Sequence, residues 1–157
     1  MANKTILDAI DRKILKYLIK NARTPFLEIA RECGISGAAI HQRIRKLDDA
    51  GVIRGSRLIV DPRMLGFDIC AYIGIRIENA KDLAAILESM KNIPEIVECN
   101  YVTGSYSLFL KLYCIDNDHL MRVLSSLQGI PGISSTETLI SLHEAFQRQI
   151  FVDCLKD

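Results

Sequence analysis

Small and hydrogen-bonding side chains recur along residues 36–47 with the spacing of a single helix face. These residues are Ala38, His41, Gln42 and Arg45, with Lys46 beside them. At about a hundred degrees of rotation per residue they share one side of a helix. Their side chains can donate hydrogen bonds to base edges or phosphates, which is the chemistry of major-groove recognition. An ordinary solvated helix surface would look the same, so the neighbouring elements must decide between these interpretations.

The opposite side of this stretch is apolar and would fix the helix to a core. Ile40, Ile44 and Leu47 recur on that side at helical spacing. Ser36 is a typical N-cap, because its hydroxyl can accept from a first-turn N–H, and it also lies at the front of the helix as a candidate DNA contact. Gly51 ends the segment. The pattern predicts an exposed recognition helix from Ser36 to about Leu47.

Two shorter helical patterns precede this helix. Asp8 can cap a first helix that runs to about Lys20. Thr24 as N-cap and Pro25 as first helical residue would open a second helix that ends near Gly34. Two short helices joined by a tight glycine turn are typical of a helix-turn-helix.

Residues 52–60, Val-Ile-Arg-Gly-Ser-Arg-Leu-Ile-Val, are expected to form two short strands around a Gly-Ser turn. This hairpin would be a wing that presents Arg54 and Arg57 to phosphates, together with Lys46. Three helices and a basic wing predict a winged helix-turn-helix domain over residues 1–60, with the third helix in the major groove.

Charge is distributed unevenly along the chain, although the net charge is only +1. Residues 1–60 hold 12 lysines and arginines against 6 acidic residues, a net of +6. The remaining residues hold 8 against 13, a net of −5. A basic small domain is expected of a protein that binds a polyanion, and it favours double-stranded DNA as the partner.

A linker at residues 61–68 separates this domain from a region with strand periodicity. Isoleucine and alanine alternate with other residues from Ile69 to Ile77, as in a strand with one buried face. Residues 69–157 then follow the order β-α-β-β-α-β, with further strands at 96–103, 108–114 and 133–142 and with helices around 83–90 and 120–127.

An internal repeat supports this order. The apolar pattern from Leu83 to Ile96 recurs 37 positions later, from Leu120 to Ile133, as expected of two βαβ units in tandem. Such a duplication predicts a ferredoxin-like four-stranded antiparallel sheet with two helices on one face. The fold class is therefore α+β, a winged helix-turn-helix followed by a ferredoxin-like βαββαβ domain.

The other face of this sheet would carry large apolar side chains, which are Tyr72, Phe109, Tyr113 or Leu139, depending on the register. A second copy of the same sheet is an economical cover for them, which predicts a two-fold homodimer. Paired recognition helices would then bind a pseudo-palindromic DNA site with half-sites about one helical turn apart, or multiples of it.

Other classes of protein find little support in the sequence. The N-terminus lacks the apolar run of a signal peptide and no stretch is apolar enough for a membrane span, so we expect a cytoplasmic protein. The five cysteines contain no C-x-x-C pair, which favours reduced thiols over disulfides or zinc. The histidines lack companions at ligand spacing, and no phosphate-binding glycine loop is present. We expect no metal, no cofactor and no enzymatic activity.

The chain resembles the Lrp/AsnC (leucine-responsive and asparagine-responsive) transcription regulators, the feast/famine proteins, over essentially its whole length. The first-helix motif of that family is similar to residues 7–15, its recognition helix to 34–36 and 43–47, and its wing to 51–55. Asp61-Pro62 and Leu65-Gly66 match its linker. The resemblance implies homodimers, commonly assembled into octamers, with small amino-acid effectors bound between subunits of neighbouring dimers.

The same resemblance identifies a candidate effector loop at Gly104-Ser105-Tyr106-Ser107, with Thr136 and Thr138 on the last strand. Family members often carry aspartate at the fourth position of this loop, where this chain has Ser107. An ammonium group in a partly dry site needs an anion or several acceptors, and serine supplies acceptors without charge. The loop is therefore expected to favour a carboxylate or neutral ligand, and a simple turn without any ligand remains the alternative.

Together these features predict an oligomeric, sequence-specific DNA-binding transcription regulator with a small amino-acid-like effector. An architectural, nucleoid-type DNA-binding protein without effector would have much the same sequence. The ratio of specific to random DNA affinity distinguishes the two, because an architectural protein loses affinity uniformly as salt rises.

Overall fold

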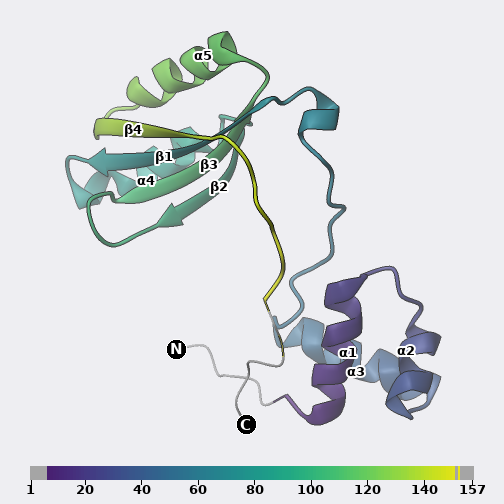
Figure 1. The fold of residues 1–157 in the computed structure, drawn as a ribbon. Helices are drawn as coiled ribbons and strands as arrows, with labels where there is room; N and C mark the ends of the chain where they lie inside the picture. The colour runs from purple at the N-terminus through teal and green to yellow at the C-terminus, as the bar shows by residue number, and fades with distance from the viewer. Residues whose placement is uncertain (1–6, 151, 153–157) are drawn as a thin grey trace. The chain divides into compact units, whose positions relative to one another are not determined.

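The computed structural model describes residues 7–150 and 152, which divide into two compact units (Figure 1). The first unit is Met1–Leu58 with Phe146–Asp157, and the second is Ile59–Ala145. Within the described part of the chain, no helix is long and apolar enough to cross a membrane.

The first unit is a three-helix domain made of α1 (Ala9–Lys20), α2 (Phe26–Cys33) and α3 (Gly37–Asp49). Asp8 caps α1, where its carboxylate accepts from the backbone N–H of Asp11 at 2.8 Å, as the sequence predicts. Gly34 ends α2 with φ 66°, a left-handed conformation in which a side chain would be strained. The core contains Ile14, Ile29, Ile40, Ile44 and Leu47.

Two local predictions in this unit were wrong. Pro25 is the N-cap of α2, and the Thr24 hydroxyl instead donates to the Asn21 carbonyl at 2.8 Å, closing the turn after α1. Residues 52–60 form no strands. Leu58 and Ile59 are 69% and 82% exposed, so a hairpin here would have no core to pack on, and an isolated two-stranded hairpin is only marginally stable.

The second unit contains a four-stranded antiparallel sheet in the order β2-β3-β1-β4. The strands are β1 (Ile69–Ile77), β2 (Ile96–Tyr101), β3 (Leu108–Cys114) and β4 (Ile133–Ser141), and the helices are α4 (Leu83–Met90) and α5 (Asn117–Gln128). Both helices cover the same face of the sheet (Figure 1). The predicted ferredoxin-like βαββαβ arrangement is confirmed.

Strand register explains which residues face the helices. Ala71, Ile73 and Ile75 of β1 are fully buried and pack with alternate residues of β3 against α4 and α5. Their neighbours therefore point to the other face, which no helix covers. That open face carries Tyr72, Phe109, Tyr113 and Leu139.

The C-terminal boundary differs from the predicted 69–157 domain. The last strand ends at Ser141, and Val152 is 7% exposed in the core cluster of the first unit, beside α1–α3 residues. An apolar residue so far beyond the last strand gives no sequence signal of where it packs. Cys154 lies outside the described residues, and Cys33, Cys70, Cys99 and Cys114 are free thiols.

Candidate functional site

Helix α3 presents the polar face that its sequence predicts. Ile40, Ile44 and Leu47 are at most 8% exposed and fix the helix to the core. The Ser36 hydroxyl accepts from the Ala39 N–H at 3.2 Å, as an N-cap does. The structure therefore brings together one exposed surface, made of Ser36, Ala38, His41, Gln42, Arg45 and Lys46.

An aromatic contact and two exposed arginines lie at the edges of this surface. The His41 ring meets the Phe26 ring of α2 edge-on, with centroids 5.3 Å apart, so α2 restrains a side chain of the candidate DNA-reading face. Arg54 and Arg57 are exposed in the extended segment after α3. Their guanidinium groups are available to solvent, although the segment lacks the predicted strands.

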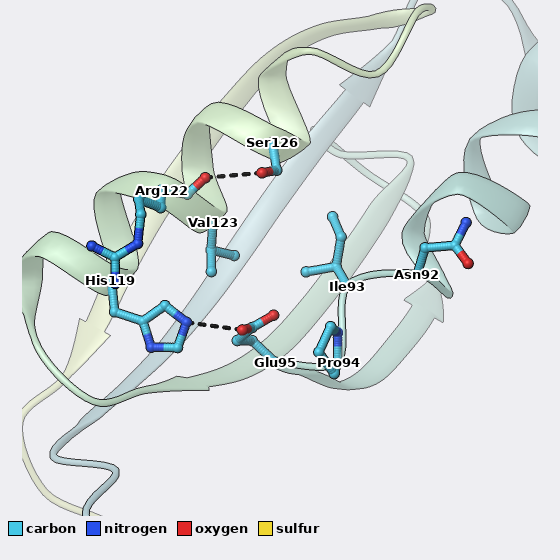
Figure 2. Close-up of a pocket in the computed structure, with 8 residues that line it drawn as sticks. All are labelled: Asn92, Ile93, Pro94, Glu95, His119, Arg122, Val123 and Ser126. Carbon is cyan, nitrogen blue, oxygen red and sulfur yellow. Dashed lines mark hydrogen bonds and ion pairs between the residues drawn. The ribbon is translucent and has the colours of Figure 1, made fainter.

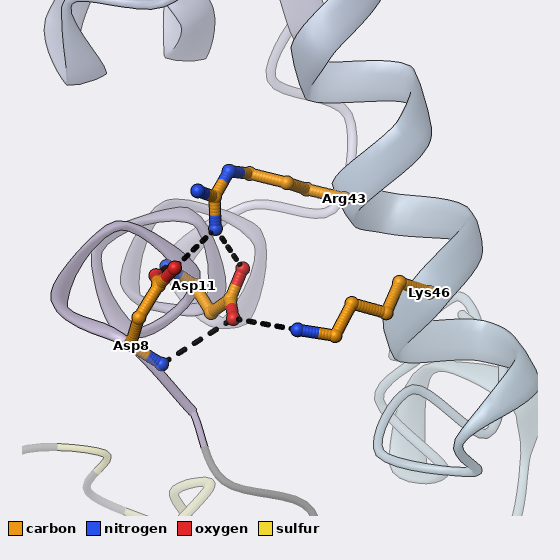
Figure 3. A network of polar contacts seen from close by, with 4 residues as sticks. All are labelled: Asp8, Asp11, Arg43 and Lys46. Carbon is orange, nitrogen blue, oxygen red and sulfur yellow. Dashed lines mark hydrogen bonds and ion pairs between the residues drawn. The ribbon is translucent and has the colours of Figure 1, made fainter.

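A network of charges that the sequence did not reveal joins α1 to α3 (Figure 3). Arg43 Nη1 donates to Asp8 Oδ2 and to Asp11 Oδ1, both at 2.7 Å. Lys46 Nζ lies 3.8 Å from Asp11 Oδ2. Hydrogen bonds from the Asp11 N–H and then from Arg43 hold the pKa of Asp8 below its ordinary value. Asp8 and Asp11 thus do more than complement the α1 dipole, because they fix α3 to α1.

The predicted effector loop connects β2 to β3 and begins at Gly104, whose φ of 111° suits only glycine. The Ser107 N–H donates to the Ile75 carbonyl at 2.8 Å, which ties the loop to the end of β1. Arg76 Nε donates to the Ser105 carbonyl at 2.9 Å. The loop is therefore a fixed turn against β1.

Tyr106 of this loop lies on the open face of the sheet. A β-carbon at Gly74 would come within 2.7 Å of the Tyr106 ring, so the ring rests directly on the β1 backbone. The Tyr106 hydroxyl donates to Glu137 Oε2, and the Arg76 guanidinium carbon lies 5.3 Å from the ring centroid. The hydrogen bond to Glu137 and burial raise the pKa of Tyr106. One aromatic side chain thus contacts both a cation and a carboxylate.

Thr136 and Thr138 lie on the other side of the same sheet. They pair in register with Ile75 and Ile73, whose side chains face α4 and α5. Gln128 Nε2 donates to Thr136 Oγ1 at 3.0 Å, which gives that hydroxyl a partner on α5. The structure therefore brings Gly104, Ser105, Tyr106 and Ser107 together and separates them from the two threonines.

Arg76 and Glu137 were not among the predicted site residues. A signal for them was present, because Gly74 interrupts a strand of branched residues, and glycine within a strand often marks a close approach of another group. Glu137 is the register partner of Gly74 on β4. Only the register shows that these residues meet Tyr106.

A separate pocket lies between the α4–β2 turn and α5 (Figure 2). His119 Nε2 and Glu95 Oε1 are 2.8 Å apart, and His119 Nδ1 accepts from the Ile115 N–H at 3.3 Å. Both ring nitrogens of His119 thus have protein partners. No predicted site residue lines this pocket, and among the described residues no group of three or more His, Cys, Asp or Glu could hold a metal ion.

Comparison with known proteins identifies both units. A family model for the Lrp/AsnC ligand binding domain matches residues 70–151, and one for a winged helix-turn-helix DNA-binding domain matches residues 7–54. Regulatory protein AsnC of Haemophilus influenzae is 42% identical over 145 residues, which cover 92% of this chain and 97% of that protein.

Solved structures agree with the sequence comparison. The structure of Escherichia coli AsnC is 41% identical with a TM-score of 0.87, and the match covers 93% of this chain and 99% of that one. A Neisseria meningitidis transcriptional regulator in complex with L-Met is 26% identical with a TM-score of 0.84, over 91% and 94% of the two chains. The helix-turn-helix, the βαββαβ unit and these matches show that the chain belongs to the Lrp/AsnC family of DNA-binding transcription regulators.

Proposed function

We propose that this regulator binds operator DNA as a homodimer, or a larger assembly of dimers, and that a small amino acid controls it by binding beside the loop 104–107. The observation that carries the proposal is the pair of opposite charges, Arg76 and Glu137, that both contact Tyr106. A free amino acid carries a carboxylate and an ammonium group that such a pair can bind together.

Glu137 bears on the identity of the ligand. The loop has Ser107 at the position where family members often carry aspartate. On the sequence alone, the missing carboxylate makes a zwitterionic ligand a poor fit. Glu137 supplies a carboxylate from the neighbouring strand, and a carboxylate accepts several hydrogen bonds, so its contact with Tyr106 leaves acceptor capacity for an ammonium group. The Neisseria relative bound to L-Met supports an amino acid as the ligand class.

A calorimetric titration of the full chain with the standard amino acids tests this site. We expect binding to be lost in Arg76→Gln and in Glu137→Gln, since each removes one charge of the pair. Glu88→Gln is the matched control, because Glu88 is 71% exposed on α4 and its ion-pair partner is the neighbouring Lys91. Unchanged affinity in both site variants would refute the proposed position.

The two faces of the sheet can be distinguished in the same titration. Gly104→Asp adds a bulky charged residue where φ is 111°, and we expect it to abolish the response. Thr138→Ala affects the helix-covered face. If Thr138→Ala alone abolished binding, the ligand would lie near the threonines instead of near Tyr106.

The open sheet face supports the homodimer. The Tyr72 and Phe109 rings stack with centroids 6.0 Å apart, and Leu139 is 49% exposed beside them. Lys111 is the one basic side chain buried there, and Glu144 pairs with it at 3.3 Å. Burial opposes the charge of Lys111, but hydrogen bonds to Tyr113 and Glu144 outweigh it and raise the pKa. A paired lysine allows the face to be covered without leaving a charge unpartnered.

Sedimentation of Leu139→Asp tests the dimer. We expect the variant to dissociate at concentrations where the native chain is dimeric, since an aspartate would be buried without a partner. Leu142→Asp, at a position 90% exposed beyond β4, is the control and should remain dimeric. Equal dimerisation in both variants would show that another surface joins the subunits.

In this proposal the protein acts by binding alone, without catalysis, in the cytoplasm. The ligand would favour one assembly state or one spacing of the α3 helices, and so change which DNA sites are bound at several points at once.

A further inference from the structure

Asp11 is a fully buried carboxylate at the start of α1. Its Oδ1 accepts from Arg43, and its Oδ2 accepts from the Asp8 N–H at 3.3 Å and lies 3.8 Å from Lys46 Nζ (Figure 3). Both oxygens are therefore occupied. One buried anion holds two cations that both belong to α3, the helix with the DNA-reading face.

The two cations differ in what they can do. Arg43 is 27% exposed and is bound by two carboxylates, so it is committed to the α1–α3 contact. Lys46 is 59% exposed and stands beside Arg45 at the edge of the exposed face. A DNA phosphate that approaches Lys46 must compete with Asp11 for its ammonium group.

Phosphate contacts carry no sequence information, and they supply most of the affinity for random DNA. An anion that restrains Lys46 therefore weakens binding to every DNA sequence alike. His41, Gln42 and Arg45 are exposed on α3 and can still bind base edges. The affinities for operator and random DNA are therefore lowered by similar factors, and the ratio between them is set by the base contacts of α3.

We propose that Asp11 is a positioning residue, which holds Lys46 and Arg43 of α3 against α1 and so limits the sequence-independent, electrostatic part of DNA binding. A purely structural role predicts a different outcome. If Asp11 only stabilised the domain, its removal would loosen α3 and weaken binding to operator and random DNA together.

The test is DNA binding by full-length Asp11→Asn, measured by fluorescence anisotropy over a range of salt. Two duplexes are used, one of random sequence and one selected from a random library by the native chain. We expect the variant to bind the random duplex about two- to fivefold more tightly at low salt, the range of an exposed ion pair. The salt slope should steepen by about 0.9, one phosphate contact, and the affinity for the selected duplex should rise by a similar factor, so that the specificity ratio stays near its native value. Weaker binding to both duplexes, or an unchanged slope, would overturn the proposal.

Asp8→Asn is the charge-matched control. The Asp8 carboxylate accepts from Arg43 at the same 2.7 Å, and its replacement by an amide changes the net charge equally. Asp8 has no contact with Lys46 in the network, so the salt slope of this variant should stay native. Lys46→Gln in the Asp11→Asn background should remove the gain in affinity. Binding of the native chain to its selected duplex tests DNA binding itself, and the difference between the two aspartate variants tests Asp11.

A second comparison leaves Asp11 in place, in case its replacement prevents folding. Lys46→Gln should reduce the native salt slope by less than Arg54→Gln does, since Arg54 is exposed and outside the network. An equal or larger reduction for Lys46→Gln would show that Asp11 does not restrain Lys46.

Discussion

The ring of Tyr106 lies against the backbone of Gly74 so closely that a β-carbon at position 74 would come within 2.8 Å of three ring atoms. Gly74 also pairs with Phe109 on β3 and with Glu137 on β4. This contact sets the position of the Tyr106 hydroxyl beside Glu137, and with it the geometry of the proposed ligand site.

Gly74→Ala should therefore move Tyr106 off the sheet. We expect a loss of about 1 to 3 kcal/mol in the free energy of unfolding, as for other overpacked sites, and loss of amino-acid binding. Denaturant unfolding and calorimetry measure the two effects. The double variant Gly74→Ala with Tyr106→Ala removes the clash, so it should recover stability relative to Gly74→Ala but not recover binding. If the two substitutions instead destabilised the protein additively, the contact between Gly74 and Tyr106 would be contradicted.

The hydroxyl of Tyr106 should titrate above the ordinary tyrosine value, because its hydrogen bond to Glu137 and its burial raise the pKa. A raised pKa means that the contact stabilises the fold below about pH 10 and that this contribution is lost as pH rises through the folded-state pKa. Absorbance at alkaline pH follows the titration, and Tyr106→Phe identifies its share of the signal. Glu137→Gln should lower the Tyr106 pKa; an unchanged titration would mean that the two groups do not interact.

Much of this fold could be predicted because local patterns and burial agree. The alternation from Ile69 to Ile77 corresponds to one buried sheet face, and Asp8 and Ser36 cap the helices that follow them. The prediction of a hairpin at residues 52–60 was wrong because the local pattern and burial disagree there. Its strand-forming residues have no core to cover them, so intrinsic propensity alone did not produce strands.

The candidate sites were predictable only where one element carries them. The exposed face of α3 follows from helical spacing, so the shared position of Gln42 and its neighbours on that face was predicted correctly. Asp11 and Arg43 are 32 residues apart, and their contact depends on how α1 packs on α3. Glu137 required the register of β4 against β1, because a shift by one residue would place it on the other face.

Gln42→Ala should cost about 1 to 3 kcal/mol of binding free energy at the preferred DNA site and relax the preference at one base pair. The reason is that Gln42 is exposed on α3 and can bind a base edge with two hydrogen bonds. Selection from a random DNA library measures the preference. Arg54→Ala is the comparison and should weaken all DNA similarly. An unchanged selection by Gln42→Ala would place the DNA-reading face elsewhere.

Arg43→Met should destabilise the contact between α1 and α3 by about 3 to 5 kcal/mol, the usual cost of leaving a buried charge without its main partner. Among the described residues, Asp11 would keep only the Asp8 N–H and the Lys46 ammonium at 3.8 Å. Hydrogen exchange of the α1 and α3 amides measures the effect within the first unit. Arg45→Met, on the exposed face of the same helix, should change exchange little.

The double variant Arg43→Met with Asp11→Asn separates two causes of this destabilisation, the unpaired charge of Asp11 and the lost packing of the arginine side chain. An amide buried at position 11 carries no charge, so the double variant should exchange more slowly than Arg43→Met alone, although it lacks both members of the pair. Exchange as fast as, or faster than, that of Arg43→Met would mean that the arginine stabilises α3 through its aliphatic contacts and not by neutralising Asp11.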